Sequence, residues 1–132
     1  MSVEIRFLTI EQVLTIHKTM IERYGGDPTL RDVGLVDSAV MMPQQSFGGE
    51  LLHPSLASMA AAYLFHLCSN HGFTDGNKPA AAGAALVFLD VNGHELALTI
   101  DELEQITMDV AKGSLEKERL SLLFEAAIRP VS

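Results

Sequence analysis

The sequence is poor in cysteine, in basic residues and in long apolar runs. Its one cysteine, Cys68, stands inside an apolar segment and has no partner for an internal disulfide, which is typical of proteins from the reducing cytoplasm. No apolar run reaches the roughly 18 residues that a membrane span needs, and the first residues show no signal-peptide pattern. We therefore expect a cytoplasmic protein without a membrane segment, in which Cys68 is a buried, small apolar residue.

Nine Lys and Arg residues stand against 17 Asp and Glu residues, which gives a formal net charge of −8 at pH 7. The basic residues are scattered, whereas neutralising the phosphates of a nucleic acid requires clustered ones. We therefore expect no direct binding of nucleic acid. On so acidic a surface, a nucleotide site must create its own positive field, which draws attention to Lys78 in the segment HGFTDGNKP.

The chain has 132 residues, 48% of them hydrophobic, which suits one domain around one sizeable core, and we expect a single domain over 1–132. Helical periodicity dominates the pattern. Thr9 forms a capping box with Gln12, and apolar residues then recur every three or four positions. Two later stretches, 54–70 and 80–91, are apolar on nearly all sides, which predicts two buried central helices. The sequence thus predicts an all-α fold, a compact bundle of about six helices.

The ends of these elements are predicted from proline, glycine and capping residues. Pro54 is expected in the first turn of the long apolar helix, where proline is tolerated. Thr99 is expected to open a second capping box, and Ser114 to cap a last helix that includes Ile128. Residues 43–53 are polar and contain glycine, so we expect a loop or flap without strands there.

The segment 71–79, HGFTDGNKP, joins the end of one apolar helix to the start of the next. The first turn of a helix has free backbone N–H groups and the positive end of the helix dipole, which makes it a ready site for an anion. Gly76 allows a ligand to approach the backbone closely, while Asn77 and Lys78 add donors and a positive charge. The segment therefore suits phosphate binding.

Two further side chains of this loop extend its chemistry. Asp75 offers an oxygen ligand of the kind that Mg²⁺ takes beside substrate phosphates, and His71 is able to accept a proton from an attacking hydroxyl near neutral pH. Such a set suits phosphoryl or nucleotidyl transfer. The same residues also suit an ordinary connection, since Asp-Gly is a common turn and Asp, Asn and His often bind helix ends. Phe73 is expected in the core in both cases, and the loop alone leaves both open.

The order HGFTDGNK between two apolar helices resembles the signature of the Fic/Doc family, His-x-Phe-x-Asp/Glu-Gly/Ala-Asn-Lys/Gly-Arg. Three other segments are similar to its Doc (death-on-curing) branch: LTIEQVLTIHKTMIERYGG at 8–26, GLVDSAV with PQQSFGGE at 34–50, and VNG at 91–93. The resemblance covers most of the chain and implies the same all-α fold. It also implies modification of a Ser/Thr hydroxyl on a target protein with ATP and Mg²⁺, by phosphorylation as in Doc proteins or by AMP transfer as in Fic proteins.

The resemblance also implies a role for each residue that matches the signature. These roles are general base for His71, core anchor for Phe73, Mg²⁺ ligand for Asp75, anion cradle for Gly76 and Asn77, and phosphate contact for Lys78. A lysine at this position, where Fic enzymes usually have glycine, is similar to Doc proteins and favours phosphorylation. The segment 42–53 would be the flap that aligns the target.

Doc-like proteins are toxins of toxin–antitoxin pairs, so the resemblance implies an antitoxin protein whose helix blocks the nucleotide site in trans, and a target among translation components. Some Fic relatives carry the inhibitory helix internally, with the pattern Ser/Thr-x-x-x-Glu-Gly/Asn. Here Ser46–Glu50 and Ser114–Glu118 match the first part of that pattern, but Leu51 and Arg119 follow the glutamates. We therefore expect the inhibitor to be a separate protein.

Pro79 departs from the signature, which has arginine at this position. A guanidinium forks onto nucleotide phosphates, whereas proline has neither a charge nor a backbone N–H. Because the first helical turn tolerates proline, we expect the fold to survive while nucleotide binding or turnover suffers. In related phosphoryl transfers a catalytic arginine is worth about 10³–10⁵-fold. Either Pro79 inactivates the site and leaves a Doc-fold protein that still engages an antitoxin, or this branch acts without the arginine.

Overall fold

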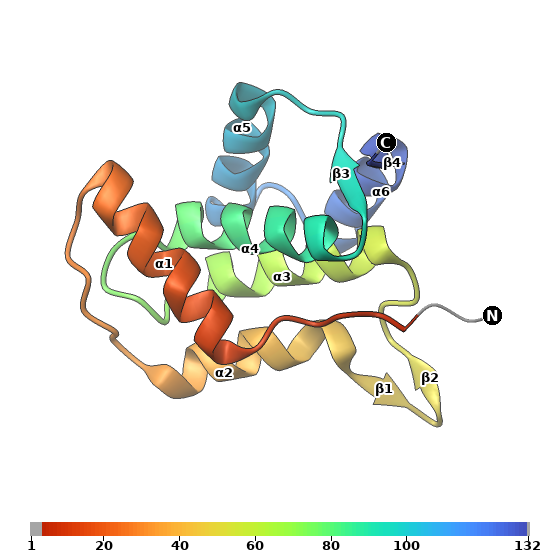
Figure 1. Ribbon diagram of the computed structural model, residues 1–132, viewed down its shortest axis with the longest axis horizontal. Coiled ribbons are helices and arrows are strands. Elements are labelled where there is room, and N and C mark those ends of the chain that lie inside the picture. Colours follow the sequence, from red (N-terminus) through yellow and green to blue (C-terminus); the bar gives the residue numbers. More distant parts are fainter. Residues whose placement is uncertain (1–3, 132) are drawn as a thin grey trace.

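The computed structural model describes residues 4–131, which form six α-helices and two small antiparallel sheets (Figure 1). The helices are α1 (Ile10–Tyr24), α2 (Val33–Met41), α3 (Leu56–Asn70), α4 (Asn77–Val91), α5 (Ile100–Ala111) and α6 (Lys117–Ala127). The sheets pair β1 (Ser46–Phe47) with β2 (Glu50–Leu51), and β3 (His94–Leu96) with β4 (Ile128–Pro130). The predicted all-α fold of about six helices is confirmed. Within the described residues, no helix has both the length and the apolar character needed to cross a membrane.

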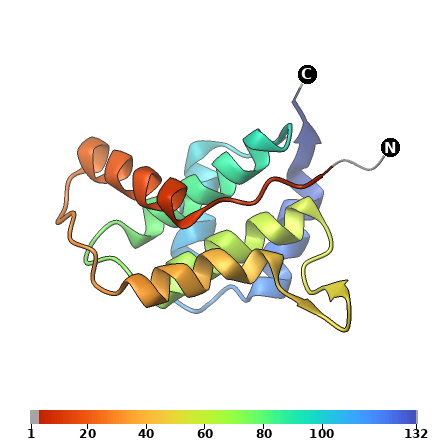
Figure 2. The same ribbon diagram turned by 60° about the horizontal axis from the view of Figure 1, so that its bottom comes forward.

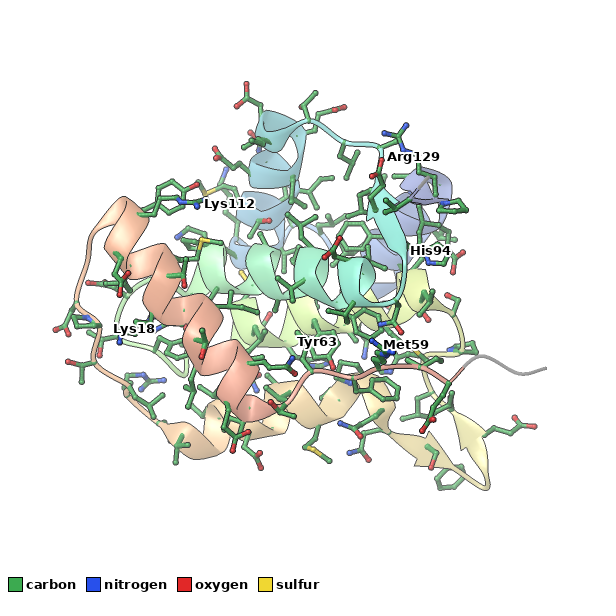
Figure 3. All side chains as sticks on the ribbon, in the orientation of Figure 1. Lys18, Met59, Tyr63, His94, Lys112 and Arg129 are labelled. Atoms are coloured by element: carbon green, nitrogen blue, oxygen red, sulfur yellow. The ribbon has the colours of Figure 1, made fainter. Side chains whose placement is uncertain are left out.

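The helices α3 and α4 lie side by side at the centre of the molecule (Figures 1 and 2) and pack mainly against each other. Ten of the 15 residues of α3 and seven of the 15 of α4 are buried, so α3 is the more deeply buried of the two helices that the sequence predicts to be central. Large side chains such as Tyr63 and Phe88 are fully buried between them and their neighbours. The hydroxyl of Tyr63, labelled in Figure 3, accepts a hydrogen bond from the N–H of Leu8 at 2.8 Å. This bond fixes the segment before α1 on the core.

The helix α1 crosses α4 at Gly83 (Figure 1). A Cβ at Gly83 would lie 2.9 Å from both Ile16 Cγ2 and Met20 Cε of α1. Glycine inside a helix costs about 1 kcal/mol relative to alanine, and here the missing side chain allows α1 to lie close to α4. On the other faces, α2 packs against α3, while α5 and α6 cover the central pair.

The predicted capping boxes at Thr9 and Thr99 are both present. The expectation that Pro54 lies in the first turn of α3 is wrong. Ser55 is the N-cap, with its Oγ accepting a hydrogen bond from the N–H of Ser58 at 3.1 Å. Because the serine hydroxyl satisfies an amide of the first turn, the helix begins after the proline rather than with it.

The expectation that Ser114 caps the last helix is also wrong. Its hydroxyl donates to the carbonyl of Asp109 at 3.1 Å and so closes the end of α5, whereas Glu116 is the N-cap of α6. Ile128 does not continue α6 but begins β4, which pairs with β3 and ties the end of the chain to the segment after α4.

Residues 43–53 contain the hairpin of β1 and β2, so the expectation of a segment without strands is wrong. Gly48 and Gly49, with φ angles of 60° and 83°, form the two-residue turn between the strands. Positive φ at both positions is what a type I′ hairpin turn requires, and adjacent glycines supply it without strain. The hairpin projects from the helices (Figure 1), and the side chain of Phe47 is 82% exposed.

Candidate active site

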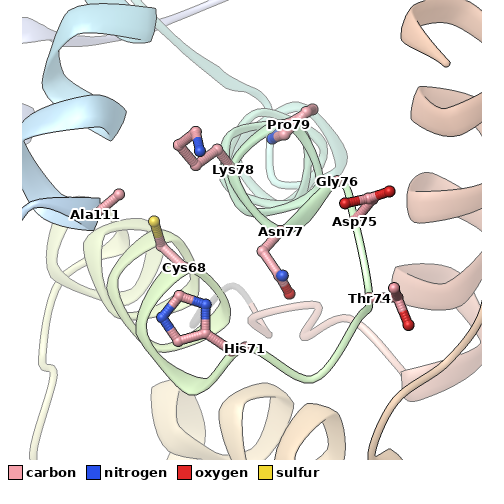
Figure 4. A pocket seen from close by; sticks show the side chains of 9 residues that line it. All are labelled: Cys68, His71, Thr74, Asp75, Gly76, Asn77, Lys78, Pro79 and Ala111. Atoms are coloured by element: carbon pink, nitrogen blue, oxygen red, sulfur yellow. The ribbon is translucent and has the colours of Figure 1, made fainter. Parts of the chain in front are cut away.

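The loop between α3 and α4 begins at His71, which ends α3 in the left-handed conformation with φ 53°. Among residues 4–131 it is the one residue other than glycine with a positive φ. This conformation costs a residue with a Cβ about 1–2 kcal/mol. The carbonyl of His71 accepts a hydrogen bond from Nε of Arg31 at 2.8 Å, which helps to hold the turn. The imidazole itself is exposed and lies beside the pocket (Figure 4).

The segment before α2 runs beside this loop and holds it through main-chain hydrogen bonds. The N–H groups of Arg31 and Asp32 donate to the carbonyl of Gly72 at 3.0 and 2.9 Å. The N–H of Thr74 donates to the carbonyl of Thr29 at 3.1 Å. The loop is therefore supported from a part of the chain that is distant in sequence, and the sequence pattern did not predict this support.

The side chain of Asn77 braces the loop from within. Its Oδ1 accepts a hydrogen bond from the N–H of Phe73 at 3.1 Å, and its Nδ2 donates to the carbonyl of the same residue at 2.9 Å. Both ends of the amide are thus engaged with the peptide of Phe73. For an anion Asn77 has left its backbone N–H, at the first position of α4, and the second hydrogen of Nδ2.

The carboxylate of Asp75 is engaged on one side. Its Oδ2 accepts a hydrogen bond from the N–H of Asp27 at 2.9 Å. The second oxygen is left for a cation, which suits Mg²⁺, since this ion is commonly held by one or two carboxylates together with substrate phosphates. Within residues 4–131 no cluster of three or more His, Cys, Asp or Glu side chains is arranged to hold a metal. The residues therefore fit a Mg²⁺ ion that a nucleotide helps to bind.

A pocket of about 180 Å³ lies between the end of α3, the start of α4 and the end of α5 (Figure 4). It is lined by Cys68, His71, Thr74, Asp75, Gly76, Asn77, Lys78, Pro79 and Ala111. Sites for drug-sized ligands usually measure about 300–1,000 Å³. The pocket is therefore smaller than a site that encloses a drug-sized ligand.

The start of α4 determines what the pocket offers to an anion. Gly76 is the N-cap, with φ 81° and no side-chain capping bond, so the N–H groups of Asn77 and Lys78 are left for a ligand. Pro79, at the third position of the helix, has no N–H, and the N–H of Ala80 already donates to the carbonyl of Gly76 at 3.0 Å. Two backbone donors and the ammonium group of Lys78 therefore face an incoming anion.

The sequence-predicted residues of the loop lie together in this pocket except for Phe73, which is 2% exposed and lies beneath the loop. Its ring stacks on the ring of His17 from α1, with centroids 3.7 Å apart and an angle of 6° between the planes. The sequence pattern places His17 among the apolar positions of α1, which indicates burial but not its partner. Cys68 is buried, as expected, and burial raises the pKa of its thiol.

Comparison with known proteins decides the family. A model of the family described as Fic/DOC matches residues 7–89, a range that includes α1, the whole loop and most of α4. The chain belongs to the Fic/DOC family. It is 40% identical to the Toxin Doc of Mycolicibacterium smegmatis over 107 residues, which are 80% of each chain. It is 31% identical to the Protein kinase doc of Escherichia phage P1 over 110 residues, which are 83% of this chain and 86% of that protein.

As a Fic/DOC protein, the chain has the family signature in the loop that lines the pocket, with Pro79 as the departure. That departure falls on a lining residue and not on a remote one, so it acts where an anion would bind. The relatives align with most of the chain and most of their own length, so the resemblance is not confined to the loop.

Proposed function

We propose that this chain is a Doc-type toxin that transfers a phosphoryl group from ATP to a Ser/Thr hydroxyl of a target protein. The observation that carries the proposal is that His71 and the first turn of α4 line the same pocket. A base and an anion site on one pocket are what phosphoryl transfer requires, because the protein mainly positions groups and stabilises charge. The names of the two relatives, a toxin and a protein kinase, favour phosphorylation over AMP transfer.

In this proposal, His71 accepts the proton of the target hydroxyl while the hydroxyl oxygen forms a bond to the γ-phosphorus of ATP. The bond from that phosphorus to the oxygen shared with the β-phosphate breaks, and ADP leaves with the electron pair. The N–H groups of Asn77 and Lys78, with the lysine ammonium, hold the phosphate oxygens. Asp75 would hold Mg²⁺, which when bound neutralises charge on the phosphates.

Pro79 gives a second candidate function specific support. It removes one of the N–H groups at the start of α4 and supplies no guanidinium inside the pocket. The second candidate is therefore a catalytically inactive Doc-fold protein that still engages an antitoxin. The two functions differ in what the chain does with ATP, not in its fold.

Two substitutions at position 79 separate the loss of the N–H from the loss of the charge. Pro79→Ala restores the N–H alone, whereas Pro79→Arg restores the N–H and a guanidinium. Purified variants are titrated with ATP and Mg²⁺, and transfer to proteins of a bacterial extract is followed with ATP labelled on the γ- or the α-phosphate. The control is Pro79→Arg combined with His71→Asn, since asparagine tolerates the left-handed conformation that position 71 requires.

If the native sequence is impaired, we expect Pro79→Arg to transfer the γ-label about 10³-fold faster than the native chain, with Pro79→Ala in between and the His71→Asn control inactive. Transfer of the α-label instead would mean AMP transfer. Equal activity of the native chain and Pro79→Arg would mean that this branch acts without the arginine. If no variant binds ATP at millimolar concentration, the enzyme proposal is wrong and the binding function remains.

We also propose that residues 1–132 fold as one domain, act in the cytoplasm on a translation component and are held inactive by a separate antitoxin protein. The names of the relatives support an antitoxin partner, because Doc-like toxins belong to toxin–antitoxin pairs. Co-expression with the product of a small open reading frame found beside the gene would test it. Relief of growth arrest and co-purification of the two proteins are the expected results, and an arrest that persists would contradict the proposal.

A further inference from the structure

His17 of α1 contacts the loop at three points, at Phe73, Asp75 and Gly76. Its ring is 4% exposed and stacks on Phe73, as described above. Its Nε2 lies 2.7 Å from the carbonyl oxygen of Asp75. Its ring edge lies 3.3 Å from the position that a Cβ on Gly76 would occupy. The loop therefore bends around the face and edge of one buried imidazole.

The bond between His17 and Asp75 has a defined direction. A carbonyl oxygen only accepts, so the proton of this bond is on Nε2 of the imidazole. The carbonyl belongs to the peptide that joins Asp75 to Gly76. The described chain has no cis peptide bond, and in a trans peptide the N–H points opposite to the C=O. Holding the carbonyl toward α1 therefore turns the N–H of Gly76 away from α1.

The pocket lies on that other side of the loop. Figure 4 shows Cys68, His71 and Ala111 across the loop from the helix that carries the colour of α1, with Thr74 and Asp75 nearest that helix. The N–H of Gly76 immediately precedes the two free N–H groups of Asn77 and Lys78. A bond that lies outside the pocket therefore orients the first of three successive donors.

We propose that His17 is a positioning residue of the phosphate site, holding the Asp75 carbonyl so that the N–H of Gly76 and the start of α4 face the phosphates. It touches neither nucleotide nor target. The inference rests on the proposed function for the identity of the ligand, while the contacts of His17 with the loop do not depend on it.

Two substitutions separate the hydrogen bond from the stacking. His17→Phe keeps a ring over Phe73 but loses the donor, whereas His17→Gln keeps an amide donor near the position of Nε2 but loses the ring. His94→Phe is the control, because it removes a histidine-to-carbonyl bond of similar length, 2.8 Å to Asn92, at a distance from the pocket. Each variant is made in the native sequence and with Pro79→Arg.

We expect His17→Phe to bind ATP with Mg²⁺, and inorganic triphosphate, about five- to ten-fold more weakly than its parent. His17→Gln and His94→Phe should bind within about two-fold of it, with all variants equally folded by circular dichroism. In ¹⁵N NMR spectra without ligand, the His17 ring should show its proton on Nε2, and the Gly76 amide signal should move in His17→Phe but not in His94→Phe.

An unchanged Gly76 signal and unchanged triphosphate affinity in His17→Phe would overturn the inference, as would equal losses in His17→Phe and His17→Gln. The proposed function fails differently, since it requires phosphate transfer. If no variant transfers phosphate but the order of affinities holds, the kinase proposal is wrong and the positioning role stands. If no variant binds either probe, the Gly76 amide signal alone decides whether His17 orients the loop.

Discussion

Replacing Gly76 with alanine tests whether the loop is wrapped around α1 as tightly as the structure indicates. Gly76 has φ 81°, and a Cβ there would lie 3.0 Å from Ile21 Cδ1 and 3.3 Å from the His17 ring. Gly93 is a matched control, because its φ is 78° and a Cβ there would have nothing within 4 Å. Both substitutions force alanine into the left-handed region, but only one adds a contact.

The left-handed conformation costs alanine about 1–2 kcal/mol, and the lower entropy of its unfolded chain offsets about 0.4–1 kcal/mol. We therefore expect Gly93→Ala to lower the free energy of unfolding by about 1 kcal/mol. Overpacking costs about 1–3 kcal/mol, and the low end applies at position 76 because Ile21 Cδ1 is the tip of a flexible side chain. Gly76→Ala should thus lose about 2 kcal/mol in total.

Urea unfolding followed by far-UV circular dichroism measures both values, and the difference of about 1 kcal/mol corresponds to roughly 3–5 °C in melting temperature. Triphosphate affinity should fall in Gly76→Ala alone, since its Cβ pushes on the residues that orient the loop. Equal losses of stability in the two variants, with unchanged affinity in both, would refute the close contact between α1 and the loop.

Three further predictions concern single contacts. Asn77→Asp replaces the donor to the Phe73 carbonyl with an oxygen and should lower the free energy of unfolding by about 1–3 kcal/mol. Urea unfolding at neutral pH measures this value, with Asn77→Gln as the comparison variant. Tyr63→Phe leaves the N–H of Leu8 without its hydrogen-bond partner. It should lower the free energy of unfolding by about 1–2 kcal/mol in the same assay, without affecting triphosphate binding. Burial first, and then the charge of Lys117, lower the pKa of His66 from 6.5 to about 4. As the pH falls, the unfolded chain therefore takes up this proton before the folded chain does. The free energy of unfolding should fall by roughly 1–2 kcal/mol between about pH 6.5 and pH 4, a value that allows for the partial exposure of the ring. Unfolding curves measured across that range should show this loss in the native chain but not in His66→Gln.

Much of the fold could be predicted because its causes are local in sequence. The capping boxes at Thr9 and Thr99 need only a residue and its third neighbour, and helices that are apolar all round must be central. Ser114 shows the limit of this reasoning, since its hydroxyl has two possible partners. It binds the carbonyl of Asp109 behind it rather than an amide ahead, and only the path of the chain decides between them.

The pocket residues between positions 71 and 79 could be named from the sequence because they are neighbours in one loop, whereas Ala111 could not, because it comes from α5. Their supports could not, since these come from elsewhere in the chain: Arg31 reaches the His71 carbonyl, and His17 reaches Asp75 across 58 positions. The side chain of Asn77 shows the same limit, because an amide that suits an anion equally suits a peptide group. Which of these it binds depends on how sharply the loop turns.

Gly83, where α1 crosses α4, connects the loop to a part of the molecule outside the pocket. Gly83 is not among the residues that line the pocket, yet its missing side chain leaves room for Ile16 and Met20 of α1, the helix that also carries His17. A methyl group at Gly83 would lie 2.9 Å from Ile16 Cγ2 and Met20 Cε, so these α1 side chains would have to move. Because the same helix carries His17, the packing of α1 on α4 at Gly83 and the hydrogen bond from His17 to the Asp75 carbonyl are linked through α1.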